Sequence, residues 1–119
     1  MSIKLFDSEL KVMNLLWERG DMTAKELSDC LLKDVGWNIN TTYTVIKKCI
    51  QKKAIERIEP NFLCHPLVSK HEIQELETNA LIDKLFNGSS NLLFANLIHK
   101  KKLTDQQIEK LYEIIGDKE

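Results

Sequence analysis

Hydrophobic residues in the first part of the chain recur at helical spacing, three and four positions apart. The pattern predicts a first helix over residues 8–19, with Asp7 as its capping residue and Gly20 as its end. A short bridging strand is expected at Asp21-Met22. The face of the first helix that we expect to be buried consists of Leu10, Met13, Leu16 and Trp17.

A capping box predicts where the second helix begins. The hydroxyl of Thr23 can accept a hydrogen bond from the amide of Glu26, whose carboxylate can accept one from the amide of Thr23. Residues 33–36 are expected to form the turn that follows this helix. Its inward-facing positions are predicted to be Ala24, Leu27 and Leu31.

Residues 39–52 predict a third helix, capped by Asn38, with two chemically different faces. One face is an apolar stripe formed by Thr42, Val45, Ile46, Cys49 and Ile50. The outward face, which Gln51 shares, carries short polar side chains, then lysines, and no acid. Short polar groups can approach base edges and lysines can neutralise phosphates. The predicted DNA-contacting residues are Asn40, Thr41, Tyr43, Thr44, Lys47, Lys48 and Lys52, together with Arg57 beyond the helix.

A β-hairpin is expected after the third helix. Two short apolar runs, Ile55 to Ile58 and Phe62-Leu63, bracket the turn-forming Pro60-Asn61. The order helix, helix, helix, hairpin is that of a winged helix-turn-helix. Pro66 marks a boundary, after which no strand signal occurs. We therefore expect a mainly α fold with a small β-hairpin: a winged helix-turn-helix domain at residues 1–68 and a three-helix dimerisation domain at residues 69–119.

The C-terminal segment carries two further helix-start signals, Ser69 with Glu72 and Thr104 with Gln107. Between them, residues 91–99 are apolar on nearly every side, and such a helix is usually buried on every side. A lobe this small can achieve that only through contact with a second subunit, so we expect a homodimer. The expected dimer contacts are Leu92, Leu93, Phe94, Leu97, Ile98, Ile108, Leu111, Tyr112 and Ile115.

Composition and charge restrict the class of protein only moderately. The chain has 119 residues, 43% of them hydrophobic and 29% charged, which is typical of a globular protein. Its net charge of −1 does not favour nucleic acid, so a DNA-binding role depends on the local cluster Lys47, Lys48, Lys52 and Lys53. We see no signal peptide and no apolar run of membrane-spanning length, and so expect a cytoplasmic protein.

Residues for catalysis or metal binding are sparse. Cys30, Cys49 and Cys64 form no CxxC pair, disulfide framework or zinc spacing. Cys64 and its neighbour His65 should point to opposite faces of a strand. No nucleophile–base pairing and no glycine-rich phosphate loop is visible. We therefore expect no enzyme, no cofactor and no metal site.

Several stretches resemble the BlaI/MecI/CopY family of penicillinase-repressor transcriptional regulators. The resemblance covers essentially the whole chain, including the final amphipathic helix. It is carried by residues 9–17 (ELKVMNLLW), 23–27 (TAKEL), Trp37 before 41–46 (TTYTVI), 66–69 (PLVS) and 86–89 (FNGS).

The resemblance implies a homodimer whose winged helices bind a palindromic operator in double-stranded DNA. In the BlaI/MecI branch, cleavage of an Asn–Phe bond in the dimerisation lobe inactivates the repressor, and a membrane sensor-protease is a candidate partner. The matching position here is Asn96-Leu97, where leucine replaces phenylalanine. The copper-responsive branch carries paired CxC motifs near the C-terminus, but this chain has no cysteine after Cys64, so the copper mechanism is not supported.

The candidate reading surface departs from the family at two places. Tyr43 stands where relatives often carry glutamine or a small polar residue, which leaves the base preference open. The hairpin lacks the glycine and the basic tip residue that are common in relatives, and Arg57 is the only nearby cation. We therefore expect a weak contact from the hairpin and specificity from the third helix alone.

Three functions stay open at this point. The first is a homodimeric repressor, resembling repressors of β-lactam resistance genes, that is released when its dimerisation lobe is disrupted or cleaved. The second is the same DNA-binding protein with a small-molecule or thiol trigger, acting through Cys30, Cys49 or Cys64. The third is a winged-helix protein-interaction module that does not bind DNA.

Overall fold

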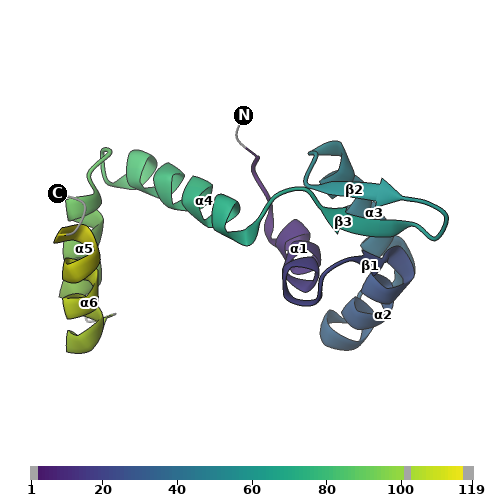
Figure 1. The fold of residues 1–119 in the computed structure, drawn as a ribbon, viewed down its shortest axis with the longest axis horizontal. Coiled ribbons are helices and arrows are strands. Elements are labelled where there is room, and N and C mark those ends of the chain that lie inside the picture. Colours follow the sequence, from purple (N-terminus) through teal and green to yellow (C-terminus); the bar gives the residue numbers. More distant parts are fainter. Residues whose placement is uncertain (1–2, 101–102, 117–119) are drawn as a thin grey trace. The chain divides into compact units, whose positions relative to one another are not determined.

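The computed structural model describes residues 3–100 and 103–116, except for the side chains of residues 111, 112 and 114–116. The chain divides into two compact units, one ending at Leu76 and one beginning at Glu77. Figure 1 shows the order of the elements along the chain.

The first unit begins with helix α1 (Asp7–Arg19), the short strand β1 (Met22–Thr23) and helix α2 (Ala24–Val35). α1 starts one residue earlier than the sequence predicts. Asp7 is its first helical residue, and Phe6 occupies the capping position. Since a phenyl ring accepts no conventional hydrogen bond from an amide, Glu9 stabilises this end, and its carboxylate accepts from the Phe6 N–H at 2.7 Å.

The start of α2 follows the sequence prediction. The Glu26 N–H donates to the Thr23 hydroxyl at 3.1 Å, and the Thr23 N–H donates to the Glu26 carboxylate at 2.9 Å. The bond from the Thr23 amide holds the pKa of the Glu26 carboxyl below its usual value. Gly36 ends the helix with a left-handed backbone (φ +75°), a conformation that glycine adopts without a steric penalty.

Helix α3 (Ile39–Gln51) is followed by strands β2 (Ile55–Ile58) and β3 (Leu63–Pro66), which form the predicted hairpin. β3 is the central strand of a three-stranded antiparallel sheet in the order β1-β3-β2. The register pairs Met22 with Cys64 on one side and Arg57 with Cys64 on the other. The hairpin is therefore tied to the start of α2 as well as to the end of α3.

The three helices and the sheet bury one common core. α1, α2 and β3 all contribute to it, and Thr42 is buried with the apolar side of α3. The indole N–H of Trp17 donates to the Val68 carbonyl at 2.9 Å, which holds the chain leaving β3 against α1. The fully buried members with the largest side chains are Met13, Leu16, Leu27, Ile46 and Ile55.

Three further helices follow: α4 (Lys70–Leu85), α5 (Ser90–His99) and α6 (Asp105–Gly116). α4 starts in the first unit, where Ile73 is buried, and continues into the second. The predicted helix starts are confirmed. Ser69 and Glu72 exchange hydrogen bonds of 3.0 and 3.2 Å, and Thr104 and Gln107 exchange bonds of 3.2 and 2.8 Å.

Candidate nucleic-acid interface

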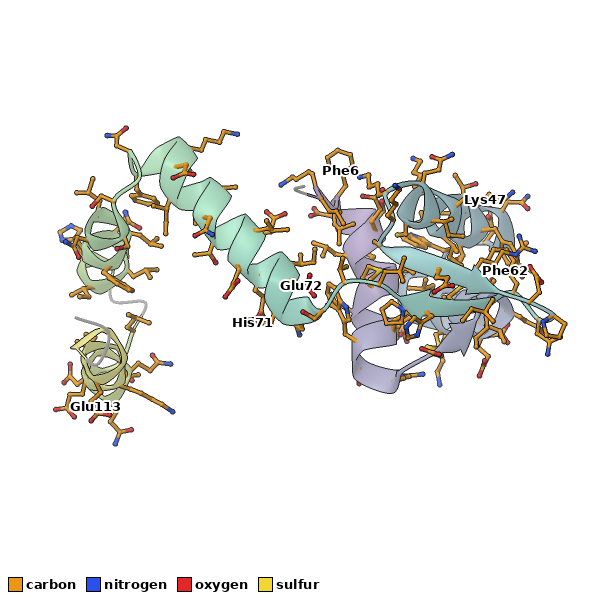
Figure 2. All side chains as sticks on the ribbon, turned by 45° about the horizontal axis from the view of Figure 1, so that its top comes forward. Phe6, Lys47, Phe62, His71, Glu72 and Glu113 are labelled. Atoms are coloured by element: carbon orange, nitrogen blue, oxygen red, sulfur yellow. The ribbon has the colours of Figure 1, made fainter. Side chains whose placement is uncertain are left out.

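Helix α3 presents a polar line to solvent opposite its buried side. Residues spaced three or four apart on a helix lie above one another on one face. Figure 2 shows Lys47, a member of this line, projecting outward from α3. The line consists of Asn40, Thr44, Lys47 and Gln51, all exposed, with the predicted residues Thr41 and Lys48 exposed beside it.

The first turn of α3 is suited to an anionic partner. The Asn38 side chain accepts from the Thr41 N–H at 2.8 Å, as predicted, and so caps the helix. The turn contains no acidic residue. A helix N-terminus carries partial positive charge, and nothing in this turn offsets it. Ile39, which the sequence prediction did not include, is 57% exposed here and adds an apolar contact.

Tyr43 lies beside the polar line but is half-buried, because it packs against the hairpin. Its ring meets that of Phe62 edge-on, with centroids 5.7 Å apart and an interplanar angle of 87°. Phe62 has a left-handed backbone (φ +52°), which is strained for an aromatic residue and persists only where surrounding contacts fix it. Its carbonyl also accepts from the Ala24 N–H at 2.9 Å. Phe62, labelled in Figure 2, thus connects the hairpin to both α2 and α3.

Arg57 is held within the hairpin. Its guanidinium carbon lies 3.7 Å from the centroid of the Phe62 ring, and its Nε forms an ion pair with Glu59. The stacked guanidinium therefore has a fixed place next to Phe62 and Tyr43, but an adjacent carboxylate offsets its charge. The sequence identified Arg57 but missed both contacts, because they depend on how the hairpin folds.

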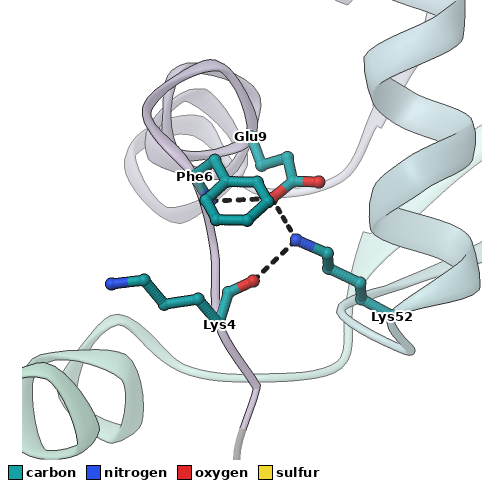
Figure 3. A network of polar contacts seen from close by, with 4 residues as sticks. All are labelled: Lys4, Phe6, Glu9 and Lys52. Atoms are coloured by element: carbon teal, nitrogen blue, oxygen red, sulfur yellow. Dashed lines mark hydrogen bonds and ion pairs between the residues drawn. The ribbon is translucent and has the colours of Figure 1, made fainter. Parts of the chain in front are cut away.

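Lys52 differs from Lys47 and Lys48, whose side chains are exposed, because other residues of the protein engage its ammonium group. Its ammonium lies 2.6 Å from the buried Glu9 carboxylate and donates to the Lys4 carbonyl at 2.7 Å (Figure 3). It also sits 4.1 Å from the centroid of the Phe6 ring. Lys52, which the sequence predicts to meet mostly phosphates, thus has its ammonium engaged by Glu9 and the Lys4 carbonyl within the protein.

The three cysteines lie in different environments. Cys49 and Cys64 are buried, and Cys30 is partly exposed, with the Arg19 guanidinium donating to its sulfur at 3.1 Å. Burial, and next the nearby Glu9 carboxylate, raise the pKa of Cys49 to about 12. Burial raises the pKa of Cys64 to about 11. A thiol trigger through Cys49 or Cys64 is therefore disfavoured, since the thiolate is the reactive form.

We expect iodoacetamide at neutral pH to label Cys30 in the folded protein and to leave Cys49 and Cys64 unmodified. The buried thiols are protected both sterically and by their raised pKa values. Mass spectrometry of the labelled protein, with and without denaturant, measures this. Labelling of Cys49 in native protein at the rate of a free thiol would contradict the packing of α3.

The described part of the C-terminal unit places the predicted dimer contacts at the surface. No residue of α5 is buried: Leu92 and Ile98 are 49% and 40% exposed, and Leu93, Phe94 and Leu97 are half-buried. Asn96, at the candidate cleavage bond Asn96-Leu97, is exposed, and its carbonyl accepts from the Lys100 N–H at 3.1 Å. Ile108 is half-buried, while the side chains of Leu111, Tyr112 and Ile115 lie outside the described residues.

Neither a metal site nor a membrane span is found in the described residues. Across residues 3–100 and 103–116, no group of three or more His, Cys, Asp or Glu side chains is placed to hold a metal ion. No helix in the same ranges is both long and apolar enough to cross a membrane. Two histidines each contact a carboxylate rather than belonging to such a metal-binding group: His65 contacts Asp21 at 2.8 Å, and His71 contacts Glu75 at 2.9 Å.

The fold and the exposed face of α3 define a winged helix-turn-helix protein. The solution structure of the DNA-binding domain of the repressor BlaI is similar, with a TM-score of 0.53 and 25% identity, covering 56% of this chain and 84% of that one. The family model described as penicillinase repressor matches residues 5–117. The chain therefore belongs to the penicillinase repressor family, as its sequence pattern predicts.

Two relatives extend this likeness over the full chain. The penicillinase repressor of Bacillus licheniformis is 24% identical over 116 residues, covering 96% of this chain and 91% of that protein. The methicillin resistance regulatory protein MecI of Staphylococcus aureus (strain N315) is 26% identical over 117 residues, covering 97% and 95%. By their names these relatives are regulators rather than enzymes, and the chain is not an enzyme.

Proposed function

We propose that this chain is a homodimeric transcriptional repressor in which each subunit inserts α3 into the major groove at one half of a palindromic operator. The observation that carries the proposal is the exposed, acid-free outer face of α3, opposite a face that buries Thr42, Val45, Ile46 and Cys49. Asn40 and Thr44 are short enough to reach base edges, and Lys47 and Lys48 are placed to meet phosphates. In such complexes the N-terminal residues of the recognition helix contact the bases.

A second copy of the chain is the partner that best fits the C-terminal unit. α5 has a nearly all-apolar sequence and no buried residue. In α4, Leu81 and Leu85 are 40% and 64% exposed. Large apolar side chains clustered at a surface favour association. A dimer also suits a palindrome, because the operator's symmetry then mirrors that of the protein. Residues 1–68 would read DNA and residues 69–119 would hold the subunits together.

Release follows from loss of the dimer. Cleavage at Asn96-Leu97 would cut α5 itself, separate its last three residues and α6 from the rest of the chain, and leave the remaining apolar residues of α5 without these partners. Because the bond lies inside a hydrogen-bonded helix, a protease must first unwind α5 locally. A membrane sensor-protease is the proposed agent. An uncut and fully active repressor in cells under β-lactam stress would overturn this route.

The names of the relatives suggest which genes are controlled. One is a penicillinase repressor and another a methicillin resistance regulatory protein. We accordingly propose that this chain represses genes for resistance to β-lactam antibiotics, acting in the cytoplasm.

The direct test is a gel shift of the purified protein on DNA from upstream of its own gene, with excess non-specific competitor. A discrete shift that resists competitor and gives a two-fold symmetric footprint supports the proposal. A folded, dimeric protein that gives no shift at low salt would favour the protein-interaction module instead. A shift that disappears on oxidation or on addition of a small molecule, without cleavage, would favour the alternative trigger.

The hairpin should bind DNA more strongly once the carboxylate of Glu59, which pairs with Arg57, is removed. In the Glu59→Gln variant, Arg57 keeps its stacking on Phe62 but loses the carboxylate beside it. We expect operator affinity to rise about 3-fold, in line with the small energy of an exposed ion pair. The dependence of log affinity on log salt should steepen by about 1.8 for the dimer if Arg57 gains one phosphate contact in each subunit. Fluorescence anisotropy across a salt series measures both quantities.

Glu56→Gln is the matched control for this variant. It makes the same change of charge within β2, one residue before Arg57, so the side chains of Glu56 and Arg57 point to opposite faces of the strand. Equal effects of the two variants would mean that only net charge matters. No effect from either would remove the hairpin from the interface.

A further inference from the structure

The end of α3 is fixed by an ionic contact that joins residues far apart in the sequence. The side chain of Glu9 is 1% exposed, and its Oε1 receives both the Lys52 ammonium at 2.6 Å and the Phe6 N–H at 2.7 Å. Lys52 donates in addition to the Lys4 carbonyl at 2.7 Å. Figure 3 shows these contacts converging between the start of α1 and the end of α3.

We infer that Lys52 is a positioning residue that sets where the recognition helix α3 lies, and that it is not a ligand for DNA phosphate. The inference rests on the proposed function, because it concerns how that interface is built. It assigns to Lys52 a role different from those of Lys47 and Lys48, although all three lysines belong to the same segment of sequence.

Burial of Glu9 is what keeps Lys52 in place. Glu9 Oε2 is buried and has no hydrogen-bond partner among the described residues, so Oε1 makes the hydrogen bonds and the ion pair seen for this carboxylate. If Lys52 turned toward a phosphate, a carboxylate with 1% exposure would lose its counter-ion. Leaving a buried carboxylate without its counter-ion is strongly unfavourable, and this opposes rotation of Lys52 toward a phosphate. Lys47 and Lys48 are exposed and face no such loss.

The location of the contact explains how it can act on α3. Lys52 is the C-capping residue of α3, and its own N–H donates to the Lys48 carbonyl at 3.0 Å. Lys53 then turns the chain with a left-handed backbone (φ +64°), and β2 begins at Ile55. The Glu9–Lys52 contact, which we call the clamp, fixes the end of α3 against α1. Because β2 begins three residues after Lys52, the same contact restrains the start of the hairpin. It therefore restrains both elements of the proposed interface.

The test compares three variants in the full-length protein: Lys47→Met, Lys48→Met and Lys52→Met. Binding to the operator and to a non-specific duplex is measured across a salt series. Lys47→Met and Lys48→Met should each reduce the salt slope by about 1.8, the value for one phosphate contact in each of two subunits, and weaken binding to both DNAs. Lys52→Met should leave the salt slope and non-specific binding unchanged. It should lower operator affinity about 10-fold, which is a loss of specificity.

The double variant Glu9→Gln/Lys52→Met guards against loss of folding, since it removes the unpaired buried charge together with the clamp. It should remain folded by circular dichroism and still show reduced preference for the operator. A fall in the salt slope of Lys52→Met by about 1.8, one phosphate contact in each subunit, would overturn the inference and restore Lys52 as a phosphate ligand. Equal losses on both DNAs, restored in the double variant, would overturn it in favour of a role in stability alone.

Failure of the proposed function gives a different result. If the wild-type protein itself does not prefer the operator over the non-specific duplex, then sequence-specific binding is absent and the positioning role falls with it. If the wild type discriminates and Lys52→Met discriminates equally well, only the positioning inference is wrong.

Discussion

Replacing Lys47 and Lys48 together with glutamate is expected to abolish operator binding at physiological salt, with a loss of at least about 100-fold. Both side chains are exposed on α3, and no ion pair joins either of them to an acid among the described residues. The double change would remove the two proposed phosphate contacts of each subunit and put negative charge against the DNA backbone. Fluorescence anisotropy on the footprinted operator, repeated across a salt series, measures the loss.

A matched control separates this local effect from that of net charge. Lys11→Glu/Lys84→Glu changes the charge by the same amount at exposed positions on α1 and α4. We expect the control to bind within about 3-fold of the wild type, because neither residue belongs to α3 or to the hairpin, the two elements of the proposed interface. Equal losses in the two double variants would show that overall charge, and not the face of α3, governs binding. Retention of the operator by Lys47→Glu/Lys48→Glu would exclude α3 as the reading element.

Features that depend on neighbours in the sequence could be predicted without the structure. The caps at Thr23, Asn38, Ser69 and Thr104 involve residues three apart, and each hydrogen bond is present as the sequence predicts. The buried stripe of α3 follows from helical periodicity, and the hairpin follows from turn residues between apolar runs. These local rules were sufficient to predict the winged helix-turn-helix fold and its exposed polar face.

Contacts between distant residues could not be predicted in this way. Glu9 and Lys52 are 43 positions apart, and only the packing of α1 against α3 brings them together. A glutamate in the first turn of a helix is ordinarily exposed, and nothing in its spacing indicates burial. The contact of Tyr43 with Phe62 likewise depends on the exact fold of the hairpin tip. Sequence reasoning therefore predicted the exposed polar face of α3 but not the pairing of Lys52 with Glu9.

The sequence also indicated that α5 needs a partner, without identifying the partner. A helix that is apolar on nearly every side is expected to be buried. In the single chain, however, no residue of α5 is buried. The difference between that expectation and the observed exposure is what supports a second subunit as the missing contact. A substitution among the exposed apolar residues of α5 should therefore disrupt dimerisation and leave the DNA contacts of α3 intact.

Leu93→Asp is expected to make the protein monomeric and to lower its affinity for the two-half-site operator by about 10²–10⁴-fold. Leu93 is half-buried within the apolar stretch of α5, so a charge there would have to be desolvated at the proposed dimer contact. In the dimer, binding of one subunit makes the second contact effectively intramolecular, and the monomer loses this gain. Size-exclusion chromatography with light scattering measures the oligomeric state, and anisotropy measures the affinity.

The same variant should keep its affinity for DNA that contains a single half-site, because α3 and its contacts belong to the other compact unit. Asn91→Asp, which adds the same charge at an exposed position in the first turn of α5, is the matched control and should remain dimeric. If Leu93→Asp stays dimeric and binds normally, α5 does not form the interface. If it becomes monomeric yet binds the full operator as tightly as the wild type, dimerisation does not supply the affinity, and cleavage of the C-terminal unit could not release the DNA by this route.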